Sequence, residues 1–423
     1  MPDMPSTEVP LPDGLLLRPL RGVRYAVPEL ADVTSPPYDL ISPDDLRNLL
    51  SLHPNNVVRL ILPGADRHRY GEARETLRNW LATGVLTIDG LPALYVYEQN
   101  GNGHLQRGVI GNVGLADPGQ GIILPHEETV PAVVADRLGL MRATEANLEP
   151  ILLLYHGGGA ATRLVGEVAE SRLPLADVRT RDGIRHRLWA VTDPDEIDAV
   201  AADLRGRRAL IADGHHRYAT YRLLQRERRE AGAGDGPWDY GLAMLVDSSA
   251  YPPQVRAIHR VVPGLTPEEA AARAKGACRV QDFTDLADAL AALADASGPA
   301  FVLAGGGHAH LLTEPDPLQL EHAMPKDRSA RWRSLDPAVL GEFLLPRVFG
   351  VPDDDPSVLV VHDDHAEAVR RADATGGTAV LLRPLSVDDV LAVAAQGELV
   401  PRKSTSFGPK PRTGLVLRTF FTD

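Results

Sequence analysis

The sequence predicts a mixed α/β or α+β protein with a two-domain architecture. Apolar runs typical of strands alternate with helical patterns, and a hairpin turn joins two of the runs. Hairpins mixed with helices do not match the regular alternation of a doubly wound sheet. The chain has 423 residues, which favours two domains, and 44% of them are hydrophobic, which is enough for packed cores.

Local signals place the first elements. We expect residues 1–13, which are polar and proline-rich at their start, to be disordered, and residues 14–20 to form the first strand. Ser42-Pro43-Asp44-Asp45 then opens a helix, because Ser42 can cap it, Pro43 suits the first helical position and acids suit the first turn. The same start signal recurs at Asp193, Thr266 and Ser386.

A β-hairpin is expected where Asn100-Gly101-Asn102-Gly103 separates two strand-like runs, residues 92–99 and 105–116. Tyr251-Pro252-Pro253 interrupts the pattern farther on, so we expect a domain boundary near residue 250. Alanine-rich helices follow that break. Other strands are expected at residues 151–155, 186–191, 209–212, 241–246, 300–303, 358–361, 378–382 and 414–417.

The most informative segment is Asp213-Gly214-His215-His216-Arg217, which lies between a strand-like run and a helical pattern. A junction of strand, glycine and helix leaves the first helical N–H groups without partners at the positive end of the helix dipole. Such a junction binds anions, and two imidazoles with a guanidinium favour a phosphate. In the alternative interpretation, Asp213 only caps the helix and the histidines lie on a solvated face.

A second candidate segment, Pro125-His126-Glu127-Glu128-Thr129, places one imidazole and two carboxylates in an expected loop. Glu127 and Glu128 are candidates for a general base or a magnesium ligand, because Mg²⁺ takes one or two carboxylates together with water and substrate phosphates. The alternative is a solvated acidic loop. Arg137 and Arg142 follow on an expected helix, and either could reach an anion.

Residues 401–414 form a basic, hydroxyl-rich segment in an otherwise acidic chain. Its cations, among them Lys403 and Lys410, could close over an anionic ligand, or the segment could be a solvated tail. The apolar run at residues 414–417 ties it to the fold. Glu98, at the end of a strand beside a turn, is a candidate ligand-binding carboxylate or an ordinary hairpin residue.

Composition excludes several classes of protein. A formal net charge of −13 argues against a general nucleic-acid binder. Cys278 is the single cysteine, so neither an intrachain disulfide nor a cysteine-based zinc site can form, which fits a reducing cytoplasm. Neither a signal-peptide core nor an apolar run of roughly 18 residues is present. We therefore expect a soluble cytoplasmic protein without a membrane partner, and the oligomeric state stays open.

Taken together, these segments resemble the bacterial and archaeal family called domain of unknown function 1015, over residues 15–417. The resemblance rests on Ser35-Pro36-Pro37-Tyr38-Asp39, Tyr97-Glu98-Gln99, Pro125-His126-Glu127-Glu128-Thr129, Ala135-Asp136-Arg137, Asn147-Leu148-Glu149-Pro150, Ala212-Asp213-Gly214-His215-His216-Arg217-Tyr218 and residues 401–414. The Asp213–Arg217 stretch also resembles the D-G-x-x-R element of the ParB/sulfiredoxin-like superfamily, which cradles phosphates. That superfamily includes free-serine kinases, and the present family is linked to pyrophosphate-dependent phosphorylation of L-serine.

The resemblance therefore implies a magnesium-dependent phosphotransferase that acts on a small hydroxyl compound. Free L-serine is the best candidate acceptor, and pyrophosphate or a nucleotide is the donor. The chain has no Walker motif or kinase glycine-rich loop, which favours a compact donor such as pyrophosphate. The alternative function is a nucleotide-binding regulatory protein of the ParB-like type that does not turn over substrate.

This hypothesis divides the candidate site residues into three groups. The candidate catalytic carboxylates are Asp213, Glu127 and Glu128, of which Glu127 and Asp213 are also candidate Mg²⁺ ligands. Phosphate binding is assigned to Gly214, His215, His216, Arg217, Arg137, Lys403 and Lys410. Substrate binding is assigned to Tyr38, Asp39, Glu98, Asn147, Ser404 and Thr405.

The same hypothesis fixes the expected domains. Residues 14–250 form the catalytic domain with the phosphate-binding motif. Residues 251–423 form a second α/β domain, whose C-terminal segment returns to the site.

Overall fold

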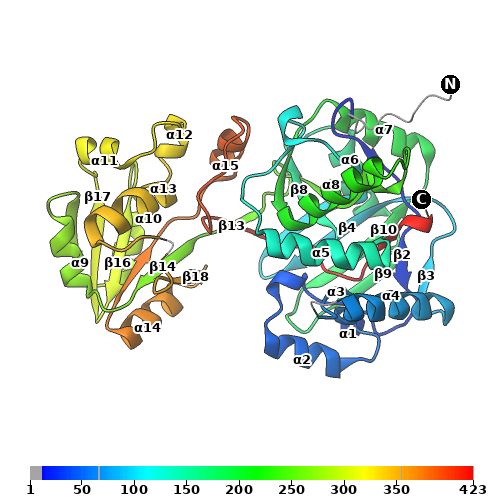
Figure 1. Ribbon diagram of the computed structural model, residues 1–423, viewed down its shortest axis with the longest axis horizontal. Coiled ribbons are helices and arrows are strands. Elements are labelled where there is room, and N and C mark those ends of the chain that lie inside the picture. The colour runs from blue at the N-terminus through cyan, green and yellow to red at the C-terminus, as the bar shows by residue number, and fades with distance from the viewer. Residues whose placement is uncertain (1–11, 65–66, 354, 423) are drawn as a thin grey trace. The chain divides into compact units, whose positions relative to one another are not determined.

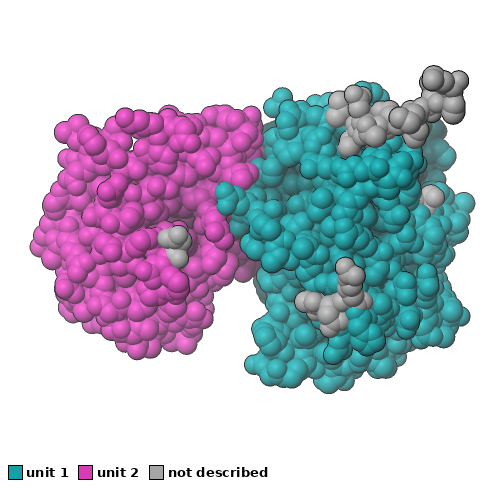
Figure 2. Space-filling model, in the orientation of Figure 1, with its two compact units in different colours: residues 1–253, 409–423 teal, residues 254–408 magenta. Residues whose placement is uncertain are grey.

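A computed structural model of the protein describes residues 12–64, 67–353 and 355–422. The disorder expected for residues 1–11 lies outside the described residues. The chain forms two compact units, shown in different colours in Figure 2. Unit 1 spans residues 1–253 and 409–423, and unit 2 spans residues 254–408. The chain therefore leaves unit 1 after Pro253 and re-enters it at Pro409.

Unit 1 is built on a mixed sheet, which confirms the predicted α/β class. Its pairs are antiparallel except for β6 with β11 and β8 with β12, which are parallel. The strand β1 (Leu17–Arg18) pairs with β5 but is not part of the strand order given next. In order across the sheet the strands are β6 (Ile123–Leu124), β11 (Ala209–Asp213), β8 (Ile151–Tyr155), β12 (Tyr240–Asp247), β5 (His104–Gly114), β4 (Leu94–Gly101), β10 (Arg185–Val191) and β9 (Ala176–Arg179).

Helices cover this sheet, as Figure 1 shows. Helix α8 packs on β8 and β12, α6 packs on β4 and β5, and α5 packs on α8. The α-helices of unit 1 are α1 (Leu30–Val33), α2 (Pro43–Leu52), α3 (Val58–Ile61), α4 (Arg67–Ala82), α5 (Pro131–Thr144), α6 (Ala160–Ser171), α7 (Pro194–Arg205) and α8 (His215–Glu230). Short 3₁₀ turns are η1 (Tyr38–Leu40), η2 (Pro118–Gln120), η3 (Pro237–Asp239) and η5 (Phe420–Thr422).

Smaller strand pairs connect distant parts of the chain. In unit 1, β2 (Val23–Tyr25) pairs with β3 (Leu86–Ile88), and β7 (Ala146–Asn147) pairs with β21 (Arg418–Thr419). The second of these pairs joins the C-terminal residues to the body of unit 1. In unit 2, β13 (Gln254–Arg256) pairs with β20 (Ser406–Gly408), so the two strands nearest the unit boundary lie side by side.

Unit 2 contains an antiparallel sheet. Its strands, in order, are β15 (Arg279–Phe283), β17 (His308–Thr313), β16 (Phe301–Gly305), β19 (Thr378–Leu381), β14 (Ile258–Val262) and β18 (Leu359–His362). The helical segments are α9 (Pro267–Ala274), α10 (Leu286–Asp295), α11 (Pro317–Ala323), α12 (Ala330–Arg333), α13 (Asp336–Val339), the π-helical η4 (Leu340–Phe349), α14 (His365–Thr375) and α15 (Val387–Ala394).

The predicted helix starts are confirmed, and each is explained by its cap. Ser42 and Asp45 form a reciprocal capping box at α2, and Asp193 accepts two backbone N–H groups at the start of α7. Thr266 and Ser386 each accept a hydrogen bond from a backbone N–H in the first turn of their helices, α9 and α15. The residues of each cap lie within three positions of one another, so the sequence alone is enough to predict the cap.

The predicted hairpin is also confirmed, and one predicted strand is wrong. β4 and β5 meet at Asn102 and Gly103, whose φ angles of 53° and 73° suit a tight hairpin turn. The run at residues 414–417 forms only an isolated bridge from Leu417 to Val23, and the strand there is β21, one residue later. Buried apolar residues surround this run, so its hydrophobicity reflects burial and not a sheet.

Each unit has its own apolar core. In unit 1 one cluster lies between the main sheet and its helices, around Ile151, Leu153 and Tyr221, and a second surrounds α3 and α4. In unit 2 the cluster lies around Val302 and Leu381. Among the described residues, no helix is both long enough and apolar enough to cross a membrane.

The glycine run after β8 generates a prediction about packing. A Cβ on Gly157 would lie 1.8 Å from Asp247 Oδ2, an atom that accepts hydrogen bonds from the Gly158 N–H and the Thr162 hydroxyl. We expect Gly157→Ala to lower the free energy of unfolding by about 2 kcal/mol, through displacement of that carboxylate. Urea denaturation measures this change.

The matched control is Gly166→Ala, inside α6, where an added Cβ meets only one atom, 4.0 Å away. Alanine there should raise the free energy of unfolding by roughly 0.5–1 kcal/mol. Equal effects of the two substitutions would contradict the packing described for Gly157.

Candidate functional site

The candidate site lies where β11 ends and α8 begins. Asp213 is the last residue of β11, and Gly214 follows it with a φ of 93°. A Cβ on Gly214 would also lie 2.8 Å from Ile151 Cγ2 and 3.2 Å from Arg217 Nε, so both the backbone angle and the space require glycine. The helix then starts at His215 with its positive dipole end at this junction.

The capping interpretation of Asp213 is wrong. Gly214 is the N-cap of α8, and no side chain caps that helix end. The Asp213 carboxylate turns instead to two cations: Oδ2 pairs with Arg217, and Oδ1 lies 2.5 Å from the Lys410 ammonium nitrogen. Lys410 pairs with Asp39 as well. Two acids and two bases from four segments of unit 1 therefore meet at one point.

Burial and charge compete in this cluster, and charge prevails. Burial opposes the ionised form of Asp213, but the charges of Arg217 and Lys410 outweigh it and lower the pKa of Asp213. Burial also opposes the cation of Lys410, whereas Asp213 and Asp39 raise its pKa. Asp213 and Lys410 are therefore charged near neutral pH, and with Arg217 the site holds two fixed cations.

Arg217 has an unused hydrogen-bond donor. Its terminal nitrogens donate to the Pro150 carbonyl and to Asp213, and its side chain is 6% exposed. Its Nε is buried and has no hydrogen-bond partner. Because an unpaired buried N–H is costly, this donor is explained if a ligand acceptor binds beside it.

Tyr38 and Glu149 lie next to these ion pairs. The Tyr38 ring lies 4.6 Å from the Arg137 guanidinium carbon and 5.9 Å from that of Arg217. The Tyr38 N–H donates to Glu149 Oε1 at 3.0 Å, and the Thr413 hydroxyl donates to the same oxygen at 3.1 Å. Burial raises the pKa of Glu149, although the charge of Arg217 acts against this.

Glu149 is a site residue that the sequence assignment did not include. It lies in the Asn147-Leu148-Glu149-Pro150 segment, and an acid next to a buried strand is the signal that could have identified it. A small pocket is lined by Glu149, Arg137 and Arg217 among others. Arg137 is anchored there by Asp136 and by the Ile61 carbonyl, 2.6 Å away.

The histidines of the motif contact the loop that carries the two glutamates. The His126 N–H donates to His215 Nε2 at 3.3 Å, and the Val130 N–H donates to His216 Nε2 at 3.0 Å. Glu127 is half-buried and Glu128 is exposed between these two contacts. The loop therefore borders the first turn of α8, next to the Asp213 ion pairs.

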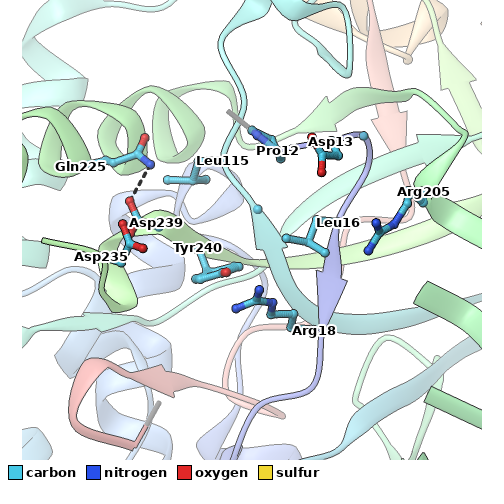
Figure 3. A pocket seen from close by; sticks show the side chains of 12 residues that line it. Pro12, Asp13, Leu16, Arg18, Leu115, Arg205, Gln225, Asp235, Asp239 and Tyr240 are labelled. Atoms are coloured by element: carbon cyan, nitrogen blue, oxygen red, sulfur yellow. Dashed lines mark hydrogen bonds between the residues drawn. The ribbon is translucent and has the colours of Figure 1, made fainter. Parts of the chain in front are cut away.

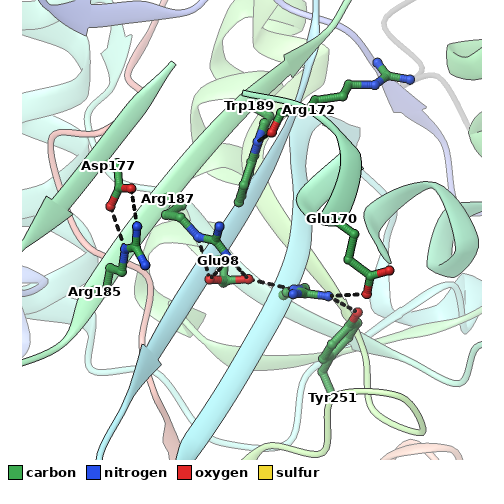
Figure 4. A network of polar contacts seen from close by, with 9 residues as sticks. Glu98, Glu170, Arg172, Asp177, Arg185, Arg187, Trp189 and Tyr251 are labelled. Atoms are coloured by element: carbon green, nitrogen blue, oxygen red, sulfur yellow. Dashed lines mark hydrogen bonds and ion pairs between the residues drawn. The ribbon is translucent and has the colours of Figure 1, made fainter. Parts of the chain in front are cut away.

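Glu98 lies elsewhere, whereas Asn147 lines the same small pocket as Arg137 and Arg217. Three strands separate β4, which carries Glu98, from β11, a separation of roughly 19 Å at about 4.8 Å per strand. Glu98 is fully buried between Arg107 and Arg187, with both oxygens paired, as Figure 4 shows for the Arg187 side. The side-chain oxygen Oδ1 of Asn147 accepts hydrogen bonds from Arg418 and from the backbone N–H of Leu242. Glu98 and Asn147 thus make structural contacts.

Lys403, Ser404 and Thr405 belong to unit 2, and their part in the site stays a prediction. The Lys403 carbonyl accepts a hydrogen bond from Arg260 at 3.3 Å, and the buried Ser404 hydroxyl has no partner. Lys410, by contrast, lies in unit 1 together with Asp213.

Three larger cavities in the described part of unit 1 are not lined by Asp213, Arg217 or Lys410. One of about 320 Å³, shown in Figure 3, is lined by Arg18, Gln225, Asp239 and Tyr240 among others. Gln225 lies ten residues along α8 from His215, a distance of roughly 15 Å at 1.5 Å per residue. In the part of the chain that the structure describes, no group of three or more His, Cys, Asp or Glu side chains is arranged to hold a metal ion.

Comparison with known proteins identifies one family. The family model described as "Protein of unknown function (DUF1015)" matches residues 17–338, a shorter range than the resemblance over residues 15–417. Among curated proteins, no sequence matches the chain.

Several solved structures are similar in part. A free serine kinase mutant in complex with AMP is 14% identical, with a TM-score of 0.35, over 73% of this chain and 92% of that one. SbnI with a C-terminal truncation, from Staphylococcus aureus, is 13% identical, with a TM-score of 0.36, over 73% and 87%. A conserved hypothetical protein from Pyrococcus furiosus is 15% identical, with a TM-score of 0.32, over 73% and 95%.

The ion pairs of Glu98 with Arg107 and Arg187 generate a prediction that distinguishes a structural role of Glu98 from a role in ligand binding. Glu98→Leu leaves Arg107 and Arg187 without their buried partner, and we expect the free energy of unfolding to fall by about 3 kcal/mol. Urea denaturation measures the loss. Phosphate affinity, followed by calorimetry, should stay within twofold of the unmodified protein. If Glu98→Leu kept full stability but bound phosphate more weakly, the prediction would be contradicted and Glu98 would be a binding residue.

The buried His126 generates a prediction about pH. Burial lowers the pKa of His126 to about 4, whereas an unfolded chain has the ordinary value of about 6.5. Below pH 6.5 the unfolded state therefore binds a proton that the folded state does not. Stability contributed by neutral His126 is complete above that pH and should fall by about 1.4 kcal/mol per pH unit down to pH 4.

The measurement is the free energy of unfolding at pH 7 and pH 5 for the unmodified chain and for His126→Gln. The variant cannot titrate in this range, so its loss on acidification should be smaller by about 2 kcal/mol. Parallel losses in the two proteins would show that His126 is not the titrating group.

Proposed function

The chain belongs to the DUF1015 family, and from that premise we propose that its Asp213 site is the active site of a phosphotransferase acting on a small hydroxyl compound. Free L-serine is the proposed acceptor, following the resemblance described above. The proposal places the phosphates of the donor at the start of α8, beside Gly214.

One observation carries the proposal: Arg217 and Lys410 converge on Asp213 at the N-terminus of α8. Both cations are largely buried, so their field is screened less than that of a surface charge. The helix dipole adds to the positive field of these cations, and the N–H at Arg217 Nε is a hydrogen-bond donor without a partner. Fixed positive charge of this kind is what phosphoryl transfer requires, because negative charge spreads over the transferred oxygens.

In the proposed reaction, the carboxylates of Asp213, Glu127 and Glu128 have different roles. Asp213 has a lowered pKa and both oxygens in ion pairs, so it is a weak proton acceptor and a good anchor for the two cations. Glu127 and Glu128 lie on the adjoining loop and are the proposed bases. The acceptor hydroxyl oxygen attacks the terminal phosphorus, the bond to the donor's bridging oxygen breaks, and the hydroxyl proton passes to a glutamate.

The donor set at Asp213 does not fit a resident Mg²⁺, because a metal there would have to displace Arg217 or Lys410. In our proposal the ion arrives with the donor's phosphates, whose charge it neutralises, and Glu127 supplies the protein carboxylate. Pyrophosphate is the proposed donor, since the chain has no loop typical of ATP-binding kinases. The proposed acid residues and the two cations all belong to unit 1.

A second candidate function has its own support. Because Asp213 is fully engaged by two cations, the site could bind a nucleotide or pyrophosphate as a regulatory ligand without turnover. Tight binding of the ligand without any phosphorylated product would favour this function.

The decisive assay combines the purified protein with Mg²⁺, L-serine and, separately, pyrophosphate, ADP or ATP. We expect phosphoserine in at least one mixture, with orthophosphate, AMP or ADP formed in equal amount, detected by ³¹P NMR and mass spectrometry. Replacing L-serine by L-alanine, which has no hydroxyl, is the control. Absence of phosphoserine from all three mixtures would refute the serine kinase proposal.

Lys410 provides the test of the site itself. Lys410→Met removes one of the two fixed cations, and we expect turnover to fall by roughly 100- to 1000-fold. The matched control is Lys326→Met, the same change at an exposed position of unit 2, which should leave turnover unchanged. Circular dichroism checks that both variants are folded. Full activity of folded Lys410→Met would rule out this site.

A further inference from the structure

Two consecutive histidines at the start of α8 contact one loop in the same way. His215 Nε2 accepts the backbone N–H of His126, and His216 Nε2 accepts the backbone N–H of Val130. The enclosed residues, 126–130, are called the acidic loop below because they carry Glu127 and Glu128. Each end of the acidic loop is therefore attached to a neighbouring residue of the same helical turn.

We propose that His215 and His216 are positioning residues that clamp the acidic loop against the start of α8. Their contribution to catalysis rests on the proposed function, in which the loop supplies the base. While each bond lasts, the Nε2 atom is an acceptor and cannot donate to a phosphate, so only Nδ1 of each ring is left as a donor. The proposal thus gives both histidines, which were assigned as phosphate ligands, the role of supporting the acidic loop.

The first end of the acidic loop is attached by more than one contact. The His126 ring nitrogen Nδ1 lies 2.7 Å from the Ile211 carbonyl, so that nitrogen must donate. The His126 and His215 rings meet edge to face, with centroids 4.4 Å apart. Because Ile211 belongs to β11, the loop is joined at this end to the strand as well as to the helix.

At the second end of the acidic loop, His216 is the residue that we propose to hold the loop against α8. Val130 is the N-cap residue of α5, and no side chain caps that helix end, so the bond from its N–H to His216 is a specific tie between loop and α8. Burial of the His216 ring keeps it neutral and able to accept, and its charged neighbours are Asp39 from η1, Asp213 from β11 and Arg217 from α8 itself.

One other feature could hold the loop without the histidines. Helix α5 packs on α8, and the Thr220 hydroxyl oxygen lies 3.4 Å from the Val134 carbonyl oxygen. If helix packing alone positioned the acidic loop, removal of an imidazole would have no effect on it. A test must therefore report on the loop backbone and not only on activity.

The experiment compares amide hydrogen exchange of the peptide covering residues 125–133 in His216→Leu and His216→Gln. Leucine removes the acceptor, and we expect exchange to be roughly fivefold faster, as for the loss of one net hydrogen bond. Glutamine retains a side-chain acceptor, and exchange should stay within twofold of the unmodified protein. His322→Leu, at an exposed position of unit 2, is the matched control and should change nothing.

Unchanged exchange in folded His216→Leu would overturn the clamp, and so would equal acceleration in His216→Leu and His216→Gln. If His216→Leu does not fold, His216→Ala takes its place under the same criteria. These outcomes do not depend on phosphoserine formation, so the clamp can fail while the proposed function holds, and the reverse is also possible.

Where turnover is measurable, kinetics separate the two roles of His216. A positioning residue should lower kcat in His216→Leu and leave KM for the donor within twofold, with kcat restored in His216→Gln. A phosphate ligand would instead raise the donor KM in both variants, which would overturn the proposal.

Discussion

The ion pairs of Asp213 with Arg217 and Lys410 constrain much of unit 1. A buried carboxylate without partners would cost several kcal/mol, so both cations must be in place when β11 is covered. Arg217 comes from the first turn of α8, but Lys410 comes from the far end of the chain. Formation of the site therefore requires that the chain return from unit 2 at Pro409 and resume its place in unit 1.

In the proposed function, a ligand that binds at these ion pairs meets charged groups that are already in position. Lys410 brings in Asp39, and Glu149 binds the backbone of Tyr38 and the hydroxyl of Thr413. An incoming phosphate would compete with carboxylates for cations whose positions are already fixed, so little reorganisation is needed. In the proposed function, the unpaired Nε of Arg217 is the donor available to such a ligand.

The five-residue motif combines four physical roles. Asp213 holds the cations, Gly214 permits the backbone turn, Arg217 faces the ion pairs, and the two histidines accept hydrogen bonds from the acidic loop. A pattern of cationic residues beside a helix start indicates an anion site, but it does not say which of those residues point their polar atoms elsewhere. Here the imidazoles bind backbone, and the guanidinium binds carboxylate.

The sequence by itself determined the local features: the helix starts at Ser42 and Asp193, the hairpin turn at Asn102 and Gly103, and the glycine at the start of α8. These depend on caps and turns that act within a few residues. The hairpin even sets Glu98 opposite Arg107, a pairing that register alone could have shown. Sequence could not place Lys410 on Asp213, Arg187 on Glu98 or Thr413 on Glu149, because such contacts depend on strand order and on the return of the chain from unit 2.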